Sequence, residues 1–190
     1  YVDMIMIRTT DHARMLELAE HATVPVINGL TDDTHPCQIM ADLQTVIEHK
    51  GSYEGLTLAW VGDGNNMANT WIEAAAIFGF KLRLACPTGY EPDSNVMAWA
   101  QAKAPGLISV TTDPKVAVNG ADVINMSLGG VSSGIGETDD TAKYRAALDL
   151  LCTAVDNAKA AGTVVVASAG NSGSWGNPEQ KPGACAGSVT

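Results

Sequence analysis

Two short strings in this sequence carry side chains whose types and spacing could bind a charged small molecule. The first runs from Thr34 to Gln38, at the predicted start of a helix. The free N–H groups and the dipole of a helix N-terminus favour an anion such as phosphate. His35 and Gln38 are three residues apart, so both side chains can face one ligand. The string therefore predicts an anion site.

The second string, Gly62 to Asn66, reads Gly-Asp-Gly-Asn-Asn and follows a predicted strand. Open parallel sheets bind ligands at the carboxyl ends of their strands. The glycines permit a tight turn, and Asn66 could hold a polar group of a ligand. Simpler roles remain open: His35 could be a capping or surface side chain, and Asn65 or Asn66 could be the N-cap of the next helix.

Alternating strands and helices must position these strings. Apolar runs predict strands at residues 2–7, 24–28, 56–62, 81–86, 107–111, 121–127 and 163–168, and 187–190 could begin another. Helical patterns lie between them, with starts expected at Thr10 or Asp11, at Pro36, near Met67, at Ser94 and at Thr141. A crossover between parallel strands needs a helix. The predicted fold class is therefore α/β, a three-layer, doubly wound, mostly parallel Rossmann-like sheet, as a single domain over residues 1–190.

Composition and charge narrow the classes of function. The formal net charge is −10, and the few Lys and Arg residues form no cluster, which argues against nucleic-acid binding. No apolar run approaches the ~20 residues that span a bilayer. The four cysteines form no C-x-x-C pair and no zinc pattern, so we expect free thiols in a reducing compartment and a cytoplasmic protein. Neither a metal nor a cofactor is predicted.

Five stretches of the chain closely resemble ornithine carbamoyltransferases, and the similarity runs from about residue 1 to about residue 123. The matching strings lie at residues 24–32, 35–38, 60–66, 86–92 and 120–123. By this resemblance, His35 and Gln38 would contact carbamoyl phosphate, and Asn66 would hold the amino-acid group of ornithine. The family transfers a carbamoyl group from carbamoyl phosphate to ornithine, giving citrulline, without a cofactor.

Three motifs of that family are not found in this sequence. They are the phosphate-binding S-x-R-T-R loop, for which Arg8-Thr9-Thr10 is no substitute, the later D-x-x-x-S-M-G loop and the H-C-L-P motif. With few cations to meet an anionic substrate, the sequence predicts at most weak binding of carbamoyl phosphate and ornithine.

From about residue 121 onward the chain resembles a different family, the subtilisin-like serine proteases. Residues 123–130 are similar to the substrate strand of that family, and residues 162–173 to its oxyanion segment. The resemblance implies that Asn171 is a remnant of an oxyanion donor. It also implies a remnant substrate strand made of Ser127, Leu128 and Gly129.

The acid, base and nucleophile motifs of such proteases are not found either, so no catalytic residue is expected. These observations predict a fused or designed chimera, joined near residues 121–123, that folds without catalytic activity. One alternative is residual carbamoyl phosphate or ornithine binding, or carbamoyltransferase activity, from the N-terminal segment. A second alternative is a function related to serine peptidases. Open sheet edges would also allow a homo-oligomer.

Overall fold

Strands and helices alternate along the chain in this computed structural model, which describes residues 1–126 and 152–167. The strands are β1 (Ile5–Arg8), β2 (Val26–Leu30), β3 (Thr57–Val61), β4 (Lys81–Ala85), β5 (Ile108–Thr111), β6 (Val123–Met126) and β7 (Val164–Ala167). The helices are α1 (His12–His21), α2 (Pro36–Lys50), α3 (Asn66–Phe78), α4 (Ser94–Lys103) and α5 (Pro114–Val118), and residues 152–160 are also helical. The predicted alternation is confirmed, whereas α5 was not predicted.

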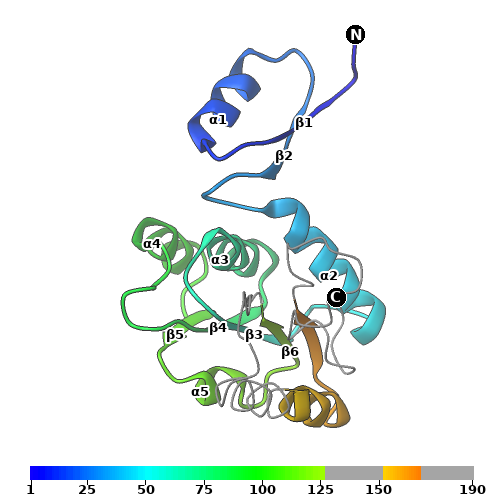
Figure 1. Cartoon of the computed structure of the whole chain (residues 1–190), viewed down its shortest axis with the longest axis vertical. Helices are drawn as coiled ribbons and strands as arrows, with labels where there is room; N and C mark the ends of the chain where they lie inside the picture. The colour runs from blue at the N-terminus through cyan, green and yellow to red at the C-terminus, as the bar shows by residue number, and fades with distance from the viewer. Residues whose placement is uncertain (127–151, 168–190) are drawn as a thin grey trace, which may run out of the picture.

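Five parallel strands form the larger sheet, in the order β5-β4-β3-β6-β7. The chain moves outward from β3 through β4 to β5, and then returns to place β6 and β7 on the other side of β3. Helices α3 and α4 cover one face, and α5 and residues 152–160 cover the other (Figure 1). The α/β class and the doubly wound topology are confirmed, and the direction of winding reverses between β3 and β6. Ligands bind at such a reversal point in open α/β sheets.

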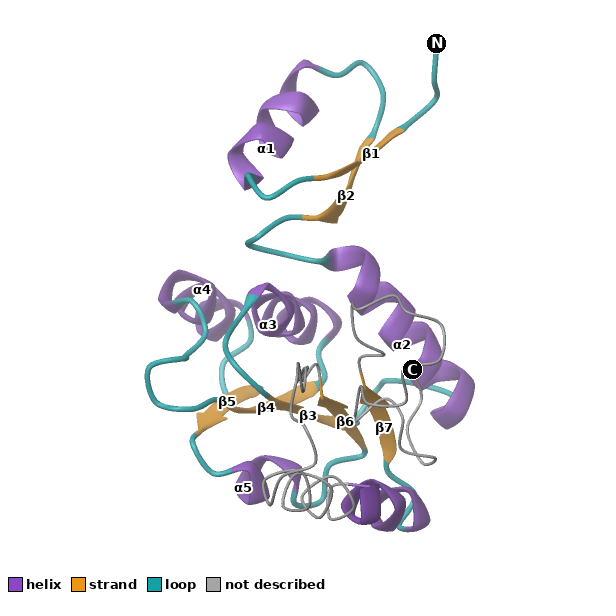
Figure 2. Ribbon diagram, in the orientation of Figure 1, coloured by secondary structure: helices purple, strands orange, loops and turns teal. Residues whose placement is uncertain are grey.

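The first two strands form a separate sheet. β1 and β2 pair in parallel with each other, and α1 connects them (Figure 2). The predicted strand at residues 24–28 is shifted, because β2 begins at Val26 and runs through Gly29 to Leu30. Helix α2 leads from this small unit down to the larger sheet.

Aromatic and aliphatic side chains fill the core between the larger sheet and α2, α3 and α4. Trp60, Trp71 and Phe80 are fully buried, and the Trp71 and Phe80 rings meet edge to face with centroids 6.0 Å apart. On α2, Ile39, Leu43 and Val46 are buried against the sheet, whereas Met40 is 49% exposed and Ile47 41% exposed.

The larger sheet is continuous across residues 121–123. β6 pairs with β3 on one side and with β7 on the other. Asp122, the residue before β6, also holds this strand against β3, because its carboxylate accepts a hydrogen bond from the N–H of Thr57 at 2.9 Å. The strand at the predicted seam is therefore a central strand of one sheet.

The cysteines do not all have the same state. Cys37 and Cys86 are free, but Cys152 is disulfide-bonded, so the prediction of four free thiols is wrong.

Among the helices of the described residues, none is both long and apolar enough to cross a membrane.

Candidate functional site

The N-terminus of α2 is built differently from those of α1, α3, α4 and α5. Each of those four helices is capped by a side chain that accepts from backbone N–H groups; the caps are Asp11, Asn65, Asp93 and Asp113. The N-cap of α2 is His35, whose side chain makes no capping bond, and Pro36 follows in the first turn. The first N–H groups of this 15-residue helix are therefore left for another acceptor.

His35 is half-buried, and its ring nitrogen Nδ1 is a buried polar atom without a hydrogen-bond partner in the described structure. Burial lowers the pKa of His35, and the nearby charge of Arg8 lowers it further. The imidazole is thus held toward its neutral form. Buried polar atoms nearly always have partners, so an unpaired nitrogen at an open helix N-terminus points to a ligand.

A second unpaired atom lies on β2, the strand that leads into this loop. Asn28, in the middle of β2, donates from Nδ2 to the hydroxyl of Thr34 at 2.9 Å, whereas its Oδ1 is buried without a partner. Its backbone carbonyl accepts from the thiol of Cys37 at 3.3 Å. Of the three such orphan atoms among the described residues, two therefore flank the loop that leads into α2.

The loop itself is held by Thr31, which is fully buried. Its N–H donates to the carbonyl of Thr34 at 2.8 Å, and its hydroxyl accepts from the Thr34 N–H at 3.1 Å. Nδ1 of His12 lies 2.9 Å from the same hydroxyl, which connects α1 to the loop. This closed turn sets the direction in which the chain enters α2.

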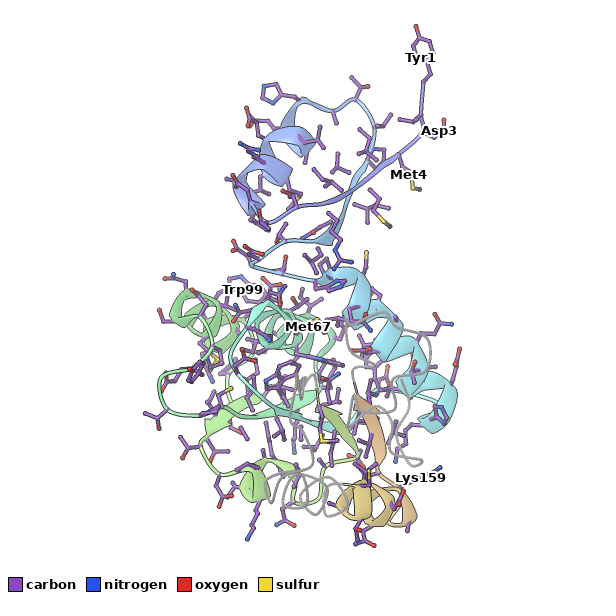
Figure 3. All side chains as sticks on the ribbon, in the orientation of Figure 1. Tyr1, Asp3, Met4, Met67, Trp99 and Lys159 are labelled. Atoms are coloured by element: carbon purple, nitrogen blue, oxygen red, sulfur yellow. The ribbon has the colours of Figure 1, made fainter. Side chains whose placement is uncertain are left out.

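Asn66 joins the loop to the start of α3. Its Nδ2 donates to the carbonyl of Thr31 at 2.8 Å. Its backbone carbonyl accepts from the Thr70 hydroxyl at 2.6 Å, and that hydroxyl accepts from the N–H of His35 at 2.8 Å. The structure therefore brings His35 and Asn66 together although they are far apart in sequence. Met67, the residue after Asn66, marks this junction in Figure 3.

Gln38 lies one turn into α2 and is exposed. Its Nε2 donates to Oδ1 of Asp42 at 2.9 Å, and Nδ2 of Asn125 on β6 donates to the other oxygen at 3.2 Å. Burial raises the pKa of Asp42, and these two hydrogen bonds oppose that rise. Sequence reasoning missed both Asp42 and Asn125. A carboxylate within the apolar stripe of α2 was the available signal, because buried carboxylates are rare unless they are bonded.

The Gly-Asp-Gly-Asn-Asn string forms the turn from β3 into α3. Asn65 is the N-cap, since its Oδ1 accepts from the N–H groups of Met67 at 2.9 Å and Ala68 at 3.2 Å. The capping role left open for Asn65 is thus confirmed. The N–H of Gly64 donates to the carbonyl of Tyr90 at 2.7 Å. Two of the strings singled out in the sequence are therefore in direct contact.

The other predicted site residues lie outside the described residues. They are the substrate-strand candidates Ser127, Leu128 and Gly129, and the oxyanion candidate Asn171. Within residues 1–126 and 152–167, no group of three His, Cys, Asp or Glu side chains is arranged to hold a metal ion.

Comparison with known proteins places this geometry in one family. Residues 1–48 match the family model "Aspartate/ornithine carbamoyltransferase, carbamoyl-P binding domain", and residues 54–147 match "Aspartate/ornithine carbamoyltransferase, Asp/Orn binding domain". The ornithine carbamoyltransferase of Pelobacter propionicus is 71% identical over 125 residues, which are 66% of this chain and 41% of that protein. That of Geobacter sulfurreducens is 57% identical over 152 residues, 80% of this chain and 49% of that protein.

A solved structure supports the same family. The ornithine carbamoyltransferase of Gloeobacter violaceus superposes with a TM-score of 0.69 at 33% identity, over 91% of this chain and 59% of that one. The chain thus spans about 40 to 50% of the length of the two curated relatives named above.

These matches overturn the prediction of a chimera. The second family model extends to residue 147, and the similarity to the Geobacter sulfurreducens protein covers 152 residues, so both run past the predicted seam at residues 121–123. Nothing in the comparisons shows a subtilase segment or an engineered origin. The prediction of a fused chimera without catalytic activity is therefore wrong, and its carbamoyltransferase alternative fits better. The chain belongs to the aspartate/ornithine carbamoyltransferase family.

Proposed function

We propose that this chain takes part in carbamoyl transfer from carbamoyl phosphate to ornithine, with its anion site at the start of α2. In this site His35 and Gln38 contact carbamoyl phosphate, and Asn66 contacts ornithine. The observation that carries the proposal is the buried, unpaired Nδ1 of His35 at a helix N-terminus that has no side-chain cap.

Carbamoyl transfer requires a hydrogen-bond donor at the carbamoyl oxygen, and His35 can supply one. The amine of ornithine attacks the carbamoyl carbon, and negative charge develops on the carbamoyl oxygen during the attack. The bond from that carbon to phosphate then breaks, and the leaving phosphate takes up the proton that the amine loses. A neutral imidazole can donate its one ring N–H to that oxygen, and donors aimed at developing charge are a large term in such reactions. The lowered pKa of His35 supports this role, because the neutral imidazole is a donor that needs no counter-charge.

Charge around the site favours an anion locally, although the whole chain carries a formal charge of −10. The open N–H groups of α2 point toward the entering loop, and the helix dipole adds a partial positive charge there. Arg8, at the end of β1, lies close enough to lower the pKa of His35. Such a site suits the phosphate end of carbamoyl phosphate.

Isothermal titration of the full chain with carbamoyl phosphate tests the binding step. We expect saturable heat for the wild type and a large loss of affinity for His35→Asn. The matched control is His49→Asn, an exposed histidine in the last turn of the same helix. Equal affinities of wild type and His35→Asn would contradict the proposed site.

Formation of citrulline from carbamoyl phosphate and ornithine tests the transfer step. We expect a rate that His35→Asn lowers and His49→Asn leaves unchanged. For the ornithine side, Asn66→Ala should weaken ornithine more than carbamoyl phosphate, with Asn95→Ala on the exposed side of α4 as control. A citrulline rate that is indifferent to His35 would refute the assignment.

A further inference from the structure

A buried carboxylate connects the proposed carbamoyl phosphate site to the centre of the larger sheet. Asp42 is only 3% exposed, and its two oxygens accept from two different elements. Nε2 of Gln38 lies 2.9 Å from Oδ1, within the same helix, and Nδ2 of Asn125 lies 3.2 Å from Oδ2. Asn125 stands on β6, next to β3, where the direction of the sheet reverses.

We infer that Asp42 is a positioning residue that turns the side-chain amide of Gln38 so that its oxygen faces the ligand and accepts from the NH2 of the carbamoyl group. This inference rests on the proposed function, since it assigns the ligand end that Gln38 reads.

The direction of the amide follows from the chemistry of the partners. An ionised carboxylate can only accept hydrogen bonds, whereas a glutamine amide has one accepting end and one donating end. The amide must therefore present its nitrogen to Asp42, and its oxygen is left on the opposite side. That oxygen can accept a hydrogen bond from the NH2 of a carbamoyl group. An acetyl group has a methyl group at this place and cannot donate.

Burial makes this orientation firm. An exposed pair with the same spacing exists on the same helix, where Nε2 of Gln44 donates to Oε1 of Glu48 at 2.9 Å. In that pair water can replace either partner. Asp42 has no such substitute, and a buried carboxylate that loses a donor pays a large desolvation cost. The second bond, from Asn125, fixes the carboxylate itself on the sheet.

Competition between two ligands that differ only at the NH2 group tests the inference. Affinities of the full chain for carbamoyl phosphate and for acetyl phosphate, which has a methyl group instead, would be measured for wild type, Asp42→Asn and Glu48→Gln. An asparagine at position 42 can meet either end of the Gln38 amide. We expect Asp42→Asn to lower the preference for carbamoyl phosphate about tenfold, the worth of one hydrogen bond, and Glu48→Gln to leave it unchanged.

The possible outcomes separate the two claims. If Asp42→Asn weakens both ligands equally, the residue is only structural and the inference is overturned, while the proposed function stands. If the wild type binds neither ligand, the proposed function fails and the inference fails with it.

A measurement on the wild type alone keeps the inference testable if Asp42→Asn does not fold. The side-chain amide protons of Gln38 and Gln44 can be compared by NMR. We expect one Gln38 proton to exchange with solvent at least tenfold more slowly than those of Gln44, because its acceptor is buried. Equal exchange rates for the two glutamines would overturn the role of Asp42.

Discussion

The backbone N–H of His35 donates to the hydroxyl of Thr70 at 2.8 Å, and so attaches the first residue of the anion site to the middle of α3. Thr70 is only 4% exposed, and its hydroxyl in turn donates to the carbonyl of Asn66 at 2.6 Å. One hydroxyl thus holds both proposed ligand-binding residues in place. The geometry of the site depends on α3 as much as on α2.

Replacing Thr70 with valine should separate this role from packing, because the two side chains have nearly the same shape. The variant leaves the N–H of His35 without its acceptor, which costs about 1–3 kcal/mol when the group stays buried. We expect Thr70→Val to lower the free energy of unfolding by that amount in urea, and Thr70→Ser, which keeps the hydroxyl, to lower it less. A valine variant as stable as wild type would contradict the role.

The pKa of His35 predicts a pH dependence of stability. Burial first, and the charge of Arg8 second, hold the folded pKa below the ordinary value of 6.5. Below pH 6.5 the unfolded chain therefore binds more protons than the folded one, so stability is full above 6.5 and falls as pH drops toward the folded pKa. The free energy of unfolding can be measured by urea denaturation from about pH 5 to about pH 8, which brackets the ordinary histidine pKa. As the pH drops, it should fall less for His35→Gln than for the wild type. Parallel curves would argue against a buried neutral imidazole.

The contribution of Arg8 to that shift can be isolated by NMR titration of the His35 ring. We expect Arg8→Gln to raise the pKa of His35, because one lowering charge is gone. The value should stay below 6.5, since burial is the larger cause and is unchanged. A pKa that does not move would show that the guanidinium does not act on the site.

Cys86 should be inert in the folded protein. It is 1% exposed, and burial together with the charges of Asp63 and Glu91 raises its pKa to about 11. Thiolate is the reactive form, so at pH 8 its share is roughly a hundredfold lower than for an ordinary thiol. Iodoacetamide labelling with peptide mapping should modify Cys86 only after denaturation, whereas the half-buried Cys37 should react in the native state. Equal native labelling of both cysteines would be the contrary result.

Much of the fold was predictable because apolar periodicity and helix signals agree in this sequence. The start of α2 at Pro36 and its end before Gly51 follow from proline and glycine preferences, and Gly51 has the expected φ of 81°. Helix α5 was missed because its five residues are too short to show a periodicity. Strand order and the separation of β1 and β2 into their own sheet depend on long-range pairing, which local patterns do not encode.

The site was predictable only in part, for a related reason. His35, Gln38 and Asn66 stand in short strings that carry their own signal. Asp42 and Asn125 meet only because β6 lies beside β3 in the folded sheet, and no spacing in the sequence records that contact. The prediction of a chimera failed because short strings carry little family signal: the protease-like string at residues 123–130 lies within residues 54–147, which match a single carbamoyltransferase model.

Gly64 lies directly against the loop that follows β4. The N–H of Gly64 donates to the carbonyl of Tyr90 at 2.7 Å, and a Cβ at this position would overlap the backbone of Glu91 and Pro92. Backbone atoms cannot rotate away as a side-chain end can, so Gly64→Ala must push apart the turn after β3 and the loop after β4.

We expect Gly64→Ala to lose about 1–3 kcal/mol of stability, as overpacked positions do, and to weaken ornithine because Asn66 is two residues away. The comparison variant is Gly106→Ala, where φ is 81° but nothing lies within 4 Å of the added atom. It should cost only the backbone strain of a left-handed residue, about 1 kcal/mol, and leave ligand affinity unchanged. If both variants lost the same stability and the same affinity, the close approach of the two loops would not be what makes Gly64 necessary.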